Sequence, residues 1–304
     1  MVEKFSIAIV GAGALGSYYG ARLALDGSDV RFLMRSELAV VRERGLTLRE
    51  RDGVRQLKAV AAFATTEEIG PVDLVLITLK TTANAELARL LPPLIHRDTL
   101  VVTLQNGLGN EEAVASLVGA ERVLGGLCFI AVVRSGPGEL TGFHTPGAIT
   151  LGEFGRPALD RTREIADLFN RAGVKCTAVE NLLEARWRKL VWNIPFNGLA
   201  VAHNLTTDRI CADPALTAEV HALMEEVRRG AAAFGFSIPD EFLRQQFDVT
   251  PPMGPYQPSS LVDFRAGREV EVETIWGEPL RRAEARGVSL PRLAQLYATL
   301  KRAV

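Results

Sequence analysis

The chain has 304 residues, 47% hydrophobic and 23% charged, which is long enough for one large domain or two ordinary ones. Its formal net charge of -1 gives no electrostatic reason to expect a nucleic acid or an anionic membrane surface as partner. No stretch approaches the roughly 18 uncharged apolar residues of a membrane span, and the N-terminal apolar run is too short for a signal peptide. We therefore expect a cytoplasmic globular protein with a small-molecule partner.

Short apolar runs alternate with helical patterns through the first two hundred residues. The runs are residues 5–10, 29–34, 73–80 and 99–107. This alternation is typical of a parallel sheet in an α/β domain. Between the second and third runs, the pair Asp52-Gly53 is flanked by alternating residues and predicts a tight hairpin.

Glycines and prolines multiply over residues 122–153, which predicts short antiparallel strands joined by turns. A helix at 160–172 and a strand near 174–180 follow. After Asn181 the pattern changes to amphipathic helices, with apolar residues at three- and four-residue spacing. These helices are predicted at residues 182–193, 214–235, 269–287 and 290–303, with a proline-rich, non-helical stretch at 248–260. We expect an α/β domain at 1–179 and a mainly helical domain at 180–304.

A glycine-rich segment, "GAGALG", follows the first predicted strand and precedes a helical run. This is the context of the dinucleotide-binding fingerprint, in which Gly11 allows the turn, Gly13 lets the backbone approach a pyrophosphate and Gly16 lets the helix pack on the strand. The N-terminus of the helix would stabilise the anion. The segment predicts a Rossmann-type domain.

Arg35 stands at the end of the second predicted strand, where an NAD-type site has an acidic residue. A guanidinium there suits the 2′-phosphate of NADP, which a carboxylate would repel. We therefore expect NADPH rather than NADH. Two alternatives remain open: Arg35 is a solvated surface residue, or the nearby Glu37 serves the ribose.

Lys189, Asn193 and Asn197 recur every four residues in an apolar segment, so a continuous helix would carry them on one face. Polar groups in such surroundings need partners, and a substrate is one. In the alternative, Lys189 extends out of a core helix and the asparagines cap a helix break before Gly198.

Ser259, Asp263 and Glu271 are spaced for one side of a helical stretch. Glu271 lies between valines, and the pattern fits either an exposed helix face or a carboxylate paired in a cleft. The four histidines are scattered without metal-ligand spacing, so we expect no metal site. The three cysteines are far apart in apolar contexts, which indicates buried thiols.

Seven segments together resemble the ketopantoate reductase (2-dehydropantoate 2-reductase) family in order and spacing, along nearly the whole chain. They are "GAGALGSYYGARL", "LMR", "TLK", "LQNGLGNEE", "RWRKLVWN", "SSLVD" and "RAGREVEVETIWG". The resemblance implies a Rossmann domain, a helical C-terminal domain like that of 6-phosphogluconate dehydrogenases, and reduction of a 2-oxo acid, ketopantoate, to pantoate with NADPH. That reaction is a step towards pantothenate and coenzyme A.

The resemblance also implies roles for single residues. Lys189 matches the catalytic lysine and Glu271 the glutamate of the conserved motif. The cofactor residues are Gly11, Ala12, Gly13, Ala14, Leu15, Gly16, Arg35, Lys80 and Asn106, and the substrate residues are Asn106, Asn193, Asn197 and Ser259. Two other functions remain open: reduction of another 2-oxo acid, and dinucleotide sensing without turnover. The sequence also leaves open whether the chain forms a homodimer.

Overall fold

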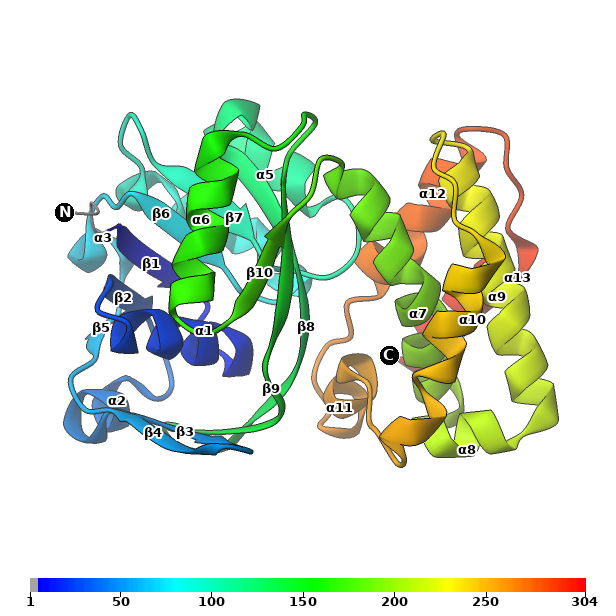
Figure 1. The fold of residues 1–304 in the computed structure, drawn as a ribbon, viewed down its shortest axis with the longest axis horizontal. Helices are drawn as coiled ribbons and strands as arrows, with labels where there is room; N and C mark the ends of the chain where they lie inside the picture. Colours follow the sequence, from blue (N-terminus) through cyan, green and yellow to red (C-terminus); the bar gives the residue numbers. More distant parts are fainter. Residues whose placement is uncertain (1–4) are drawn as a thin grey trace. The chain divides into compact units, whose positions relative to one another are not determined.

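The computed structural model describes residues 5–304, apart from the side chains of residues 144 and 145. The chain divides into two compact units (Figure 1). The first unit contains the residues up to Gln105 together with Asn110–Leu182, and the second contains Asn106–Gly109 together with Leu183–Val304. The short segment Asn106–Gly109 therefore belongs to the second unit, although it lies between two parts of the first unit in the sequence.

The first unit is built on one sheet with the strand order β4-β3-β9-β8-β7-β6-β1-β2-β5, and β10 pairs with β9. The strands are β1 (Ser6–Val10), β2 (Asp29–Leu33), β3 (Leu46–Glu50), β4 (Gly53–Leu57), β5 (Ala61–Phe63), β6 (Leu74–Ile77), β7 (Leu100–Thr103), β8 (Val123–Gly136), β9 (Glu139–Glu153) and β10 (Lys175–Ala178). Among the described residues, β3–β4 and β8–β9 pair antiparallel and the other neighbours pair parallel.

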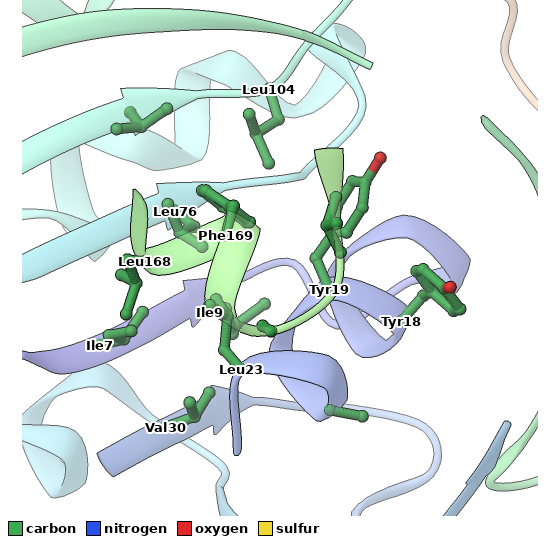
Figure 2. Close-up of a cluster of buried hydrophobic side chains, with 14 of the residues drawn as sticks. Ile7, Ile9, Tyr18, Tyr19, Leu23, Val30, Leu76, Leu104, Leu168 and Phe169 are labelled. Atoms are coloured by element: carbon green, nitrogen blue, oxygen red, sulfur yellow. The ribbon is translucent and has the colours of Figure 1, made fainter. Parts of the chain in front are cut away.

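Helices cover both faces of this sheet, as the continuous apolar runs predict. Alternate residues of β1 belong to two different cores: Ile7 and Ile9 to one, Ala8 and Val10 to the other. Figure 2 shows the first core, where Ile7 lies near Leu168. The helices and turns are α1 (Ala14–Leu25), α2 (Leu38–Arg44), α3 (Thr66–Ile69), η1 (Thr81–Glu86), α4 (Leu87–Leu90), η2 (Pro92–Leu94), α5 (Asn110–Val118), η3 (Ala120–Arg122) and α6 (Asp160–Arg171).

The structure confirms the four predicted parallel strands, which form β1, β2, β6 and β7, and also the helix at 160–172 and the strand near 174–180. The predicted hairpin is β3–β4, but Glu50 pairs with Gly53, so Arg51 and Asp52 form its turn. Gly53 is the last paired position, with φ of +142°. The hairpin extends the sheet, because β3 also pairs with β9.

The prediction of several short strands over 122–153 is wrong. This region forms one long antiparallel pair, β8 and β9, with irregularities in register near Ala131 and Arg134. The glycines lie within the strands because they make room there. A Cβ at Gly126 would lie 2.4 Å from Leu104 Cδ2, and Gly147, with φ of +72°, would meet Phe129 O at 2.7 Å. Glycine inside a strand often marks such close approaches.

The second unit is helical in the part that the structure describes. Its elements are α7 (Leu182–His203), α8 (Thr207–Ala212), α9 (Pro214–Ala232), α10 (Asp240–Asp248), η4 (Pro251–Met253), α11 (Ser259–Arg265), the π-helical turn η5 (Glu273–Gly277), α12 (Glu278–Glu284) and α13 (Pro291–Ala303). Its core surrounds the fully buried Trp187 and Trp276. Trp276 Nε1 donates to Ile194 O at 3.0 Å, which ties η5 to the middle of α7.

One predicted helix of this unit is partly wrong. The segment 269–287 was expected to be one amphipathic helix, but the helical backbone begins at Val272. The preceding helix, α11, ends because Gly267 adopts φ of +64° and Arg268 N bonds back to Asp263 O at 2.9 Å, a typical glycine C-terminus. Glu271 follows this break, so it does not share a helical stretch with Ser259 and Asp263. No helix in the described residues is long and apolar enough to cross a membrane.

A buried carboxylate joins the end of β9 to the start of α6. Glu153 accepts hydrogen bonds from Thr162 Oγ1 at 2.6 Å, Arg161 Nε at 3.0 Å and Arg156 Nε at 3.2 Å. Burial alone would raise the pKa of this carboxyl, but the hydrogen bonds from Arg161 and Thr162 outweigh it and hold the pKa below its ordinary value. The charged form of Glu153 therefore stabilises the folded state.

Replacing Glu153 with Gln is expected to lower the free energy of unfolding at pH 7 by about 1.5–3 kcal/mol, the range for hydrogen bonds to charged groups. A carboxyl whose pKa is depressed by folding contributes stability above its unfolded pKa, and this contribution is lost as pH falls through the folded pKa. The difference between wild type and variant should therefore shrink below about pH 4.3. Urea unfolding at several pH values measures this difference in the free energy of unfolding. Glu86→Gln, which breaks an exposed ion pair with Arg89, is the control and should change little. A pH-independent difference would contradict this account of Glu153.

Candidate active site

The glycine loop connects β1 to α1. Gly11 adopts φ of +107°, and a Cβ there would lie 2.6 Å from Leu79 N, just after β6. At Gly16 a Cβ would lie 2.3 Å from Thr78 Oγ1, which itself donates to Gly11 O at 2.7 Å. Gly11 and Gly16 thus allow the loop, the first turn of α1 and the end of β6 to approach closely.

Gly13 differs from these two glycines. A Cβ there would meet only Gly11 O, at 3.9 Å, so the space beside Gly13 is open. The helix begins at Ala14, and its N-cap makes no side-chain hydrogen bond. The first amides of a helix have no partner within it, and they attract an anion. The loop therefore fits a phosphate group, with open backbone on one side and tight packing on the other.

The loop lies at the point where the order in which strands are added to the sheet reverses. β1 has β2 on one side and β6 on the other, all parallel, so the chain builds outwards in both directions from β1. In open α/β sheets, ligands bind outside the carboxyl ends of strands at such a point. Lys80 follows β6 at this edge and is exposed.

Two charged residues after β2 differ in their surroundings. Arg35 is exposed and makes no ion pair or hydrogen bond with the described residues. Glu37 is engaged: Arg134 Nη1 lies 3.1 Å from its Oε1, and Gly138 N donates to its Oε2 at 3.2 Å. The guanidinium of Arg35 is thus available to a ligand, whereas both carboxylate oxygens of Glu37 already have partners.

A network of amide side chains lies at the same strand ends, and the sequence patterns did not predict it. Gln105, after β7, donates from Nε2 to Asn84 Oδ1 at 2.7 Å and to Leu79 O at 3.0 Å. Asn84 in turn donates to Asn110 Oδ1 at 3.2 Å. The only sequence signal was the polar run that follows each strand. The network fixes the segments after β6 and β7 relative to each other.

In the second unit, the structure brings together two residues singled out from the sequence. Lys189 Nζ on α7 donates to Asn106 Oδ1 at 3.0 Å. Asn106 is positioned by its neighbours, because Leu108 N donates to Thr274 O at 2.9 Å. Gly107, with φ of +86°, allows this approach: a Cβ there would lie 2.2 Å from the same Thr274 oxygen. The amide acceptor gives the lysine ammonium a defined direction.

The asparagines of α7 are buried on the helix. Because α7 continues past Gly198 to His203, the alternative in which they cap a helix break is wrong. Asn193 is 7% exposed, and its side chain has no hydrogen-bond partner among the described residues. Asn197 is 3% exposed, and its Oδ1 accepts from Ser260 N at 3.1 Å and from Ser259 Oγ at 3.5 Å. Asn197 thus connects α7 to the start of α11.

Two carboxylates near α11 and η5 have different surroundings. Asp263 pairs with Arg268, whose Nε lies 2.9 Å from its Oδ1, and this ion pair joins α11 to the residues that follow its end. Glu271 is 6% exposed and belongs to the core of the second unit, so the exposed alternative for this residue is wrong. Burial of a carboxylate is costly unless it is paired, which makes Glu271 a candidate for a role at the site.

The described residues contain no cluster of three or more His, Cys, Asp or Glu side chains that could hold a metal ion. No disulfide joins the three cysteines, all of which lie in the described residues, and burial raises the pKa of the Cys176 thiol to about 12, so this thiol is not a ready nucleophile.

Two family models match this chain. The model described as "Ketopantoate reductase PanE/ApbA" matches residues 7–156, and "Ketopantoate reductase PanE/ApbA C terminal" matches residues 181–303. A 2-dehydropantoate 2-reductase from Nostoc is 42% identical over 97% of this chain and 93% of the relative. The match therefore extends through both compact units.

Solved structures give the same result. The crystal structure of a 2-dehydropantoate 2-reductase from Geobacter metallireducens has a TM-score of 0.95 at 43% identity, covering 98% of this chain and 99% of that one. D-mandelate dehydrogenase, in a ternary structure with NADH and anilino(oxo)acetate, has a TM-score of 0.90 at 23% identity, covering 98% and 97% of the two chains. That second likeness shows a shared fold.

Replacing Gly107 with Ala is expected to destabilise the second unit, because a Cβ cannot fit against the Thr274 carbonyl. The free energy of unfolding should fall by more than the roughly 1–2 kcal/mol that left-handed backbone costs an L-residue. Gly254→Ala is the matched control: its φ is +64°, but a Cβ there meets nothing within 4 Å. Urea unfolding of both variants separates the two effects. If both variants lose the same free energy of unfolding, the close approach at Gly107 does not contribute to stability.

Proposed function

The chain belongs to the ketopantoate reductase family, and we propose that it reduces ketopantoate (2-dehydropantoate) to pantoate with NADPH, a step of pantothenate and coenzyme A biosynthesis. Proteins of this family are oxidoreductases that depend on a dinucleotide. The observation that carries the proposal is the hydrogen bond between Lys189 Nζ and Asn106 Oδ1. It fixes an ammonium group, the general acid that reduction of a ketone needs, in a chain that also has a glycine loop suited to a pyrophosphate.

We assign cofactor binding to residues 1–179 and substrate binding with catalysis to residues 180–304. In the first region, the loop from Gly11 to Gly16 holds the pyrophosphate, with Ala12, Ala14 and Leu15 supplying backbone between the glycines. Arg35 holds the 2′-phosphate, and its lack of a protein partner supports this role. Lys80 and Asn106 complete the cofactor residues by resemblance to the family.

When bound, the dinucleotide supplies the hydride. Lys189 polarises the substrate carbonyl with its ammonium and gives a proton to the oxygen as negative charge develops there. Asn106 accepts one N–H of Lys189 and so limits the directions of the remaining two, which otherwise rotate freely on a flexible stem. Glu271, a buried carboxylate in the same unit, helps to orient the lysine ammonium.

The substrate's polar groups are held by Asn193, Asn197 and Ser259. Support comes from unused hydrogen-bonding capacity: Asn193 has no partner among the described residues, and Asn197 uses its Oδ1 while its Nδ2 has no acceptor there. Buried amides normally find partners, and a hydroxylated carboxylic acid offers several acceptors. Ser259 is exposed and lies beside Asn197, so it can contribute a hydroxyl. We place the enzyme in the cytoplasm.

Replacing Lys189 with Met keeps the apolar stem and removes the ammonium. We expect kcat for ketopantoate reduction to fall about 10²–10⁴-fold, the usual contribution of a general acid. The dissociation constant of NADPH, measured by fluorescence titration, should remain within about threefold, because a factor of ten would require 1.4 kcal/mol. Arg188→Met is the control: Arg188 immediately precedes Lys189 on α7 and pairs with Glu184, and its replacement should leave turnover nearly unchanged. Turnover at the wild-type rate without the ammonium would exclude Lys189 as the acid.

Replacing Arg35 with Ala should weaken NADPH binding about 10- to 100-fold, which corresponds to charge-assisted hydrogen bonds of about 1.5–3 kcal/mol. NADH lacks the 2′-phosphate, so its dissociation constant should change little. Arg44→Ala removes a strongly exposed arginine from α2 and is the control for a general loss of positive charge. Titration of both cofactors checks this expectation. An equal loss for NADPH and NADH would mean that Arg35 does not contact the 2′-phosphate.

A further inference from the structure

Arg134 joins two parts of the cofactor region that the sequence left unconnected. From β8, its Nη1 lies 3.1 Å from Glu37 Oε1, and its Nη2 donates to Ala12 O in the glycine loop at 2.8 Å. One guanidinium therefore bridges the residues after β2 and the phosphate loop. All three residues belong to the first unit.

The second oxygen of Glu37 is also engaged. Gly138 N, in the turn between β8 and β9, donates to Glu37 Oε2 at 3.2 Å, and the Glu37 side chain is 17% exposed. The turn itself is held, because Gly138 O accepts from Thr47 N on β3 at 2.9 Å. Glu37 is therefore clamped by the β8–β9 hairpin through both of its oxygens.

The charge on Glu37 matters because of its position. It lies two residues after Arg35, close to where a dinucleotide site recognises the adenine ribose. A carboxylate that faced this place would accept hydrogen bonds from ribose hydroxyls and would repel a 2′-phosphate. It would also compete for the guanidinium of Arg35. The ion pair with Arg134 removes both effects while leaving Arg35 without a protein partner.

We propose that Arg134 is a positioning residue that determines cofactor specificity: by holding and neutralising Glu37, it leaves Arg35 to the 2′-phosphate and so favours NADPH over NADH. This inference rests on the proposed function, and it adds a residue from β8 that the motif after β2 does not contain. Exposed ion pairs often contribute little to stability, but this pair is partly buried, and its effect is on the charge that the ligand meets.

The test compares Arg134→Gln, Glu37→Gln and the double variant. Direct titration with NADP⁺ and NAD⁺ gives the two dissociation constants, and adenosine 2′,5′-bisphosphate against 5′-AMP isolates the 2′-phosphate contact. In Arg134→Gln the charge of Glu37 is no longer neutralised and acts on the 2′-phosphate, so NADP⁺ should bind about tenfold more weakly, as expected for charges separated by several ångströms near a protein surface. NAD⁺ should bind equally well or more tightly.

The double variant is the decisive member of the set. Without the Glu37 charge, loss of Arg134 should no longer matter, so NADP⁺ affinity should return to within about threefold of wild type. The double variant leaves no unpaired carboxylate, so it remains a test even if Arg134→Gln proves unstable. Arg134→Lys should retain the preference for NADP⁺, because it keeps the charge beside Glu37.

Two results would overturn the inference. If Arg134→Gln weakens NADP⁺ and NAD⁺ equally, or if the double variant is not rescued, Arg134 acts only by holding Ala12 and the loop. Failure of this inference can be distinguished from failure of the proposed function. A wild-type protein that binds NAD⁺ as tightly as NADP⁺ contradicts the NADPH proposal, whereas a wild-type preference that survives Arg134→Gln contradicts only the role of Arg134.

Discussion

The hydrogen bond from Lys189 to Asn106 joins residues that lie 83 positions apart, and the proposed chemistry depends on it. A lysine ammonium on its flexible stem has many orientations, and catalysis requires one of them. Asn106 can restrict the ammonium because its own segment is held to η5 through Leu108 and Thr274. The close approach at Gly107 is therefore part of the same constraint, since any side chain there would displace the segment that carries the acceptor.

The cofactor region follows a similar principle, in which side chains act by fixing backbone. Thr78 bonds to the Gly11 carbonyl, and Arg134 bonds to the Ala12 carbonyl, so the glycine loop is held from β6 and from β8. These contacts use carbonyl oxygens, which leaves the first amides of α1, after the loop, for an anion. Preorganised donors of this kind do not have to be ordered when the ligand binds, and this reduces the cost of binding.

Local patterns predicted a large part of this structure. Strand–loop–helix order revealed β1, the glycine loop and α1, and four-residue spacing was sufficient to place Lys189, Asn193 and Asn197 on one helix. The resemblance to a family added Asn106, which spacing alone would not have related to Lys189. The prediction of strand boundaries was wrong where glycine can serve either of two structures. Glycines in β8 and β9 make room within long strands, but their number in the sequence indicated turns.

Contacts between segments far apart in the chain also could not be predicted from sequence patterns. The ion pair between Glu37 and Arg134 depends on the pairing of two long strands, including irregularities in their register beside Arg134. Burial of Glu271 depends on where α11 ends, and Gly267 decides that. Each of these features is set by tertiary packing, which periodicity and spacing do not record.

The most direct measurement of the central claim is the oxidation of NADPH by the wild-type protein with ketopantoate, followed by absorbance and compared with other branched 2-oxo acids. The account predicts rapid NADPH consumption with stoichiometric formation of pantoate, and slower turnover with the other acids. If NADPH binds but ketopantoate is not reduced, the proposed reaction is contradicted, and the site must act on a different substrate or bind the dinucleotide without turnover.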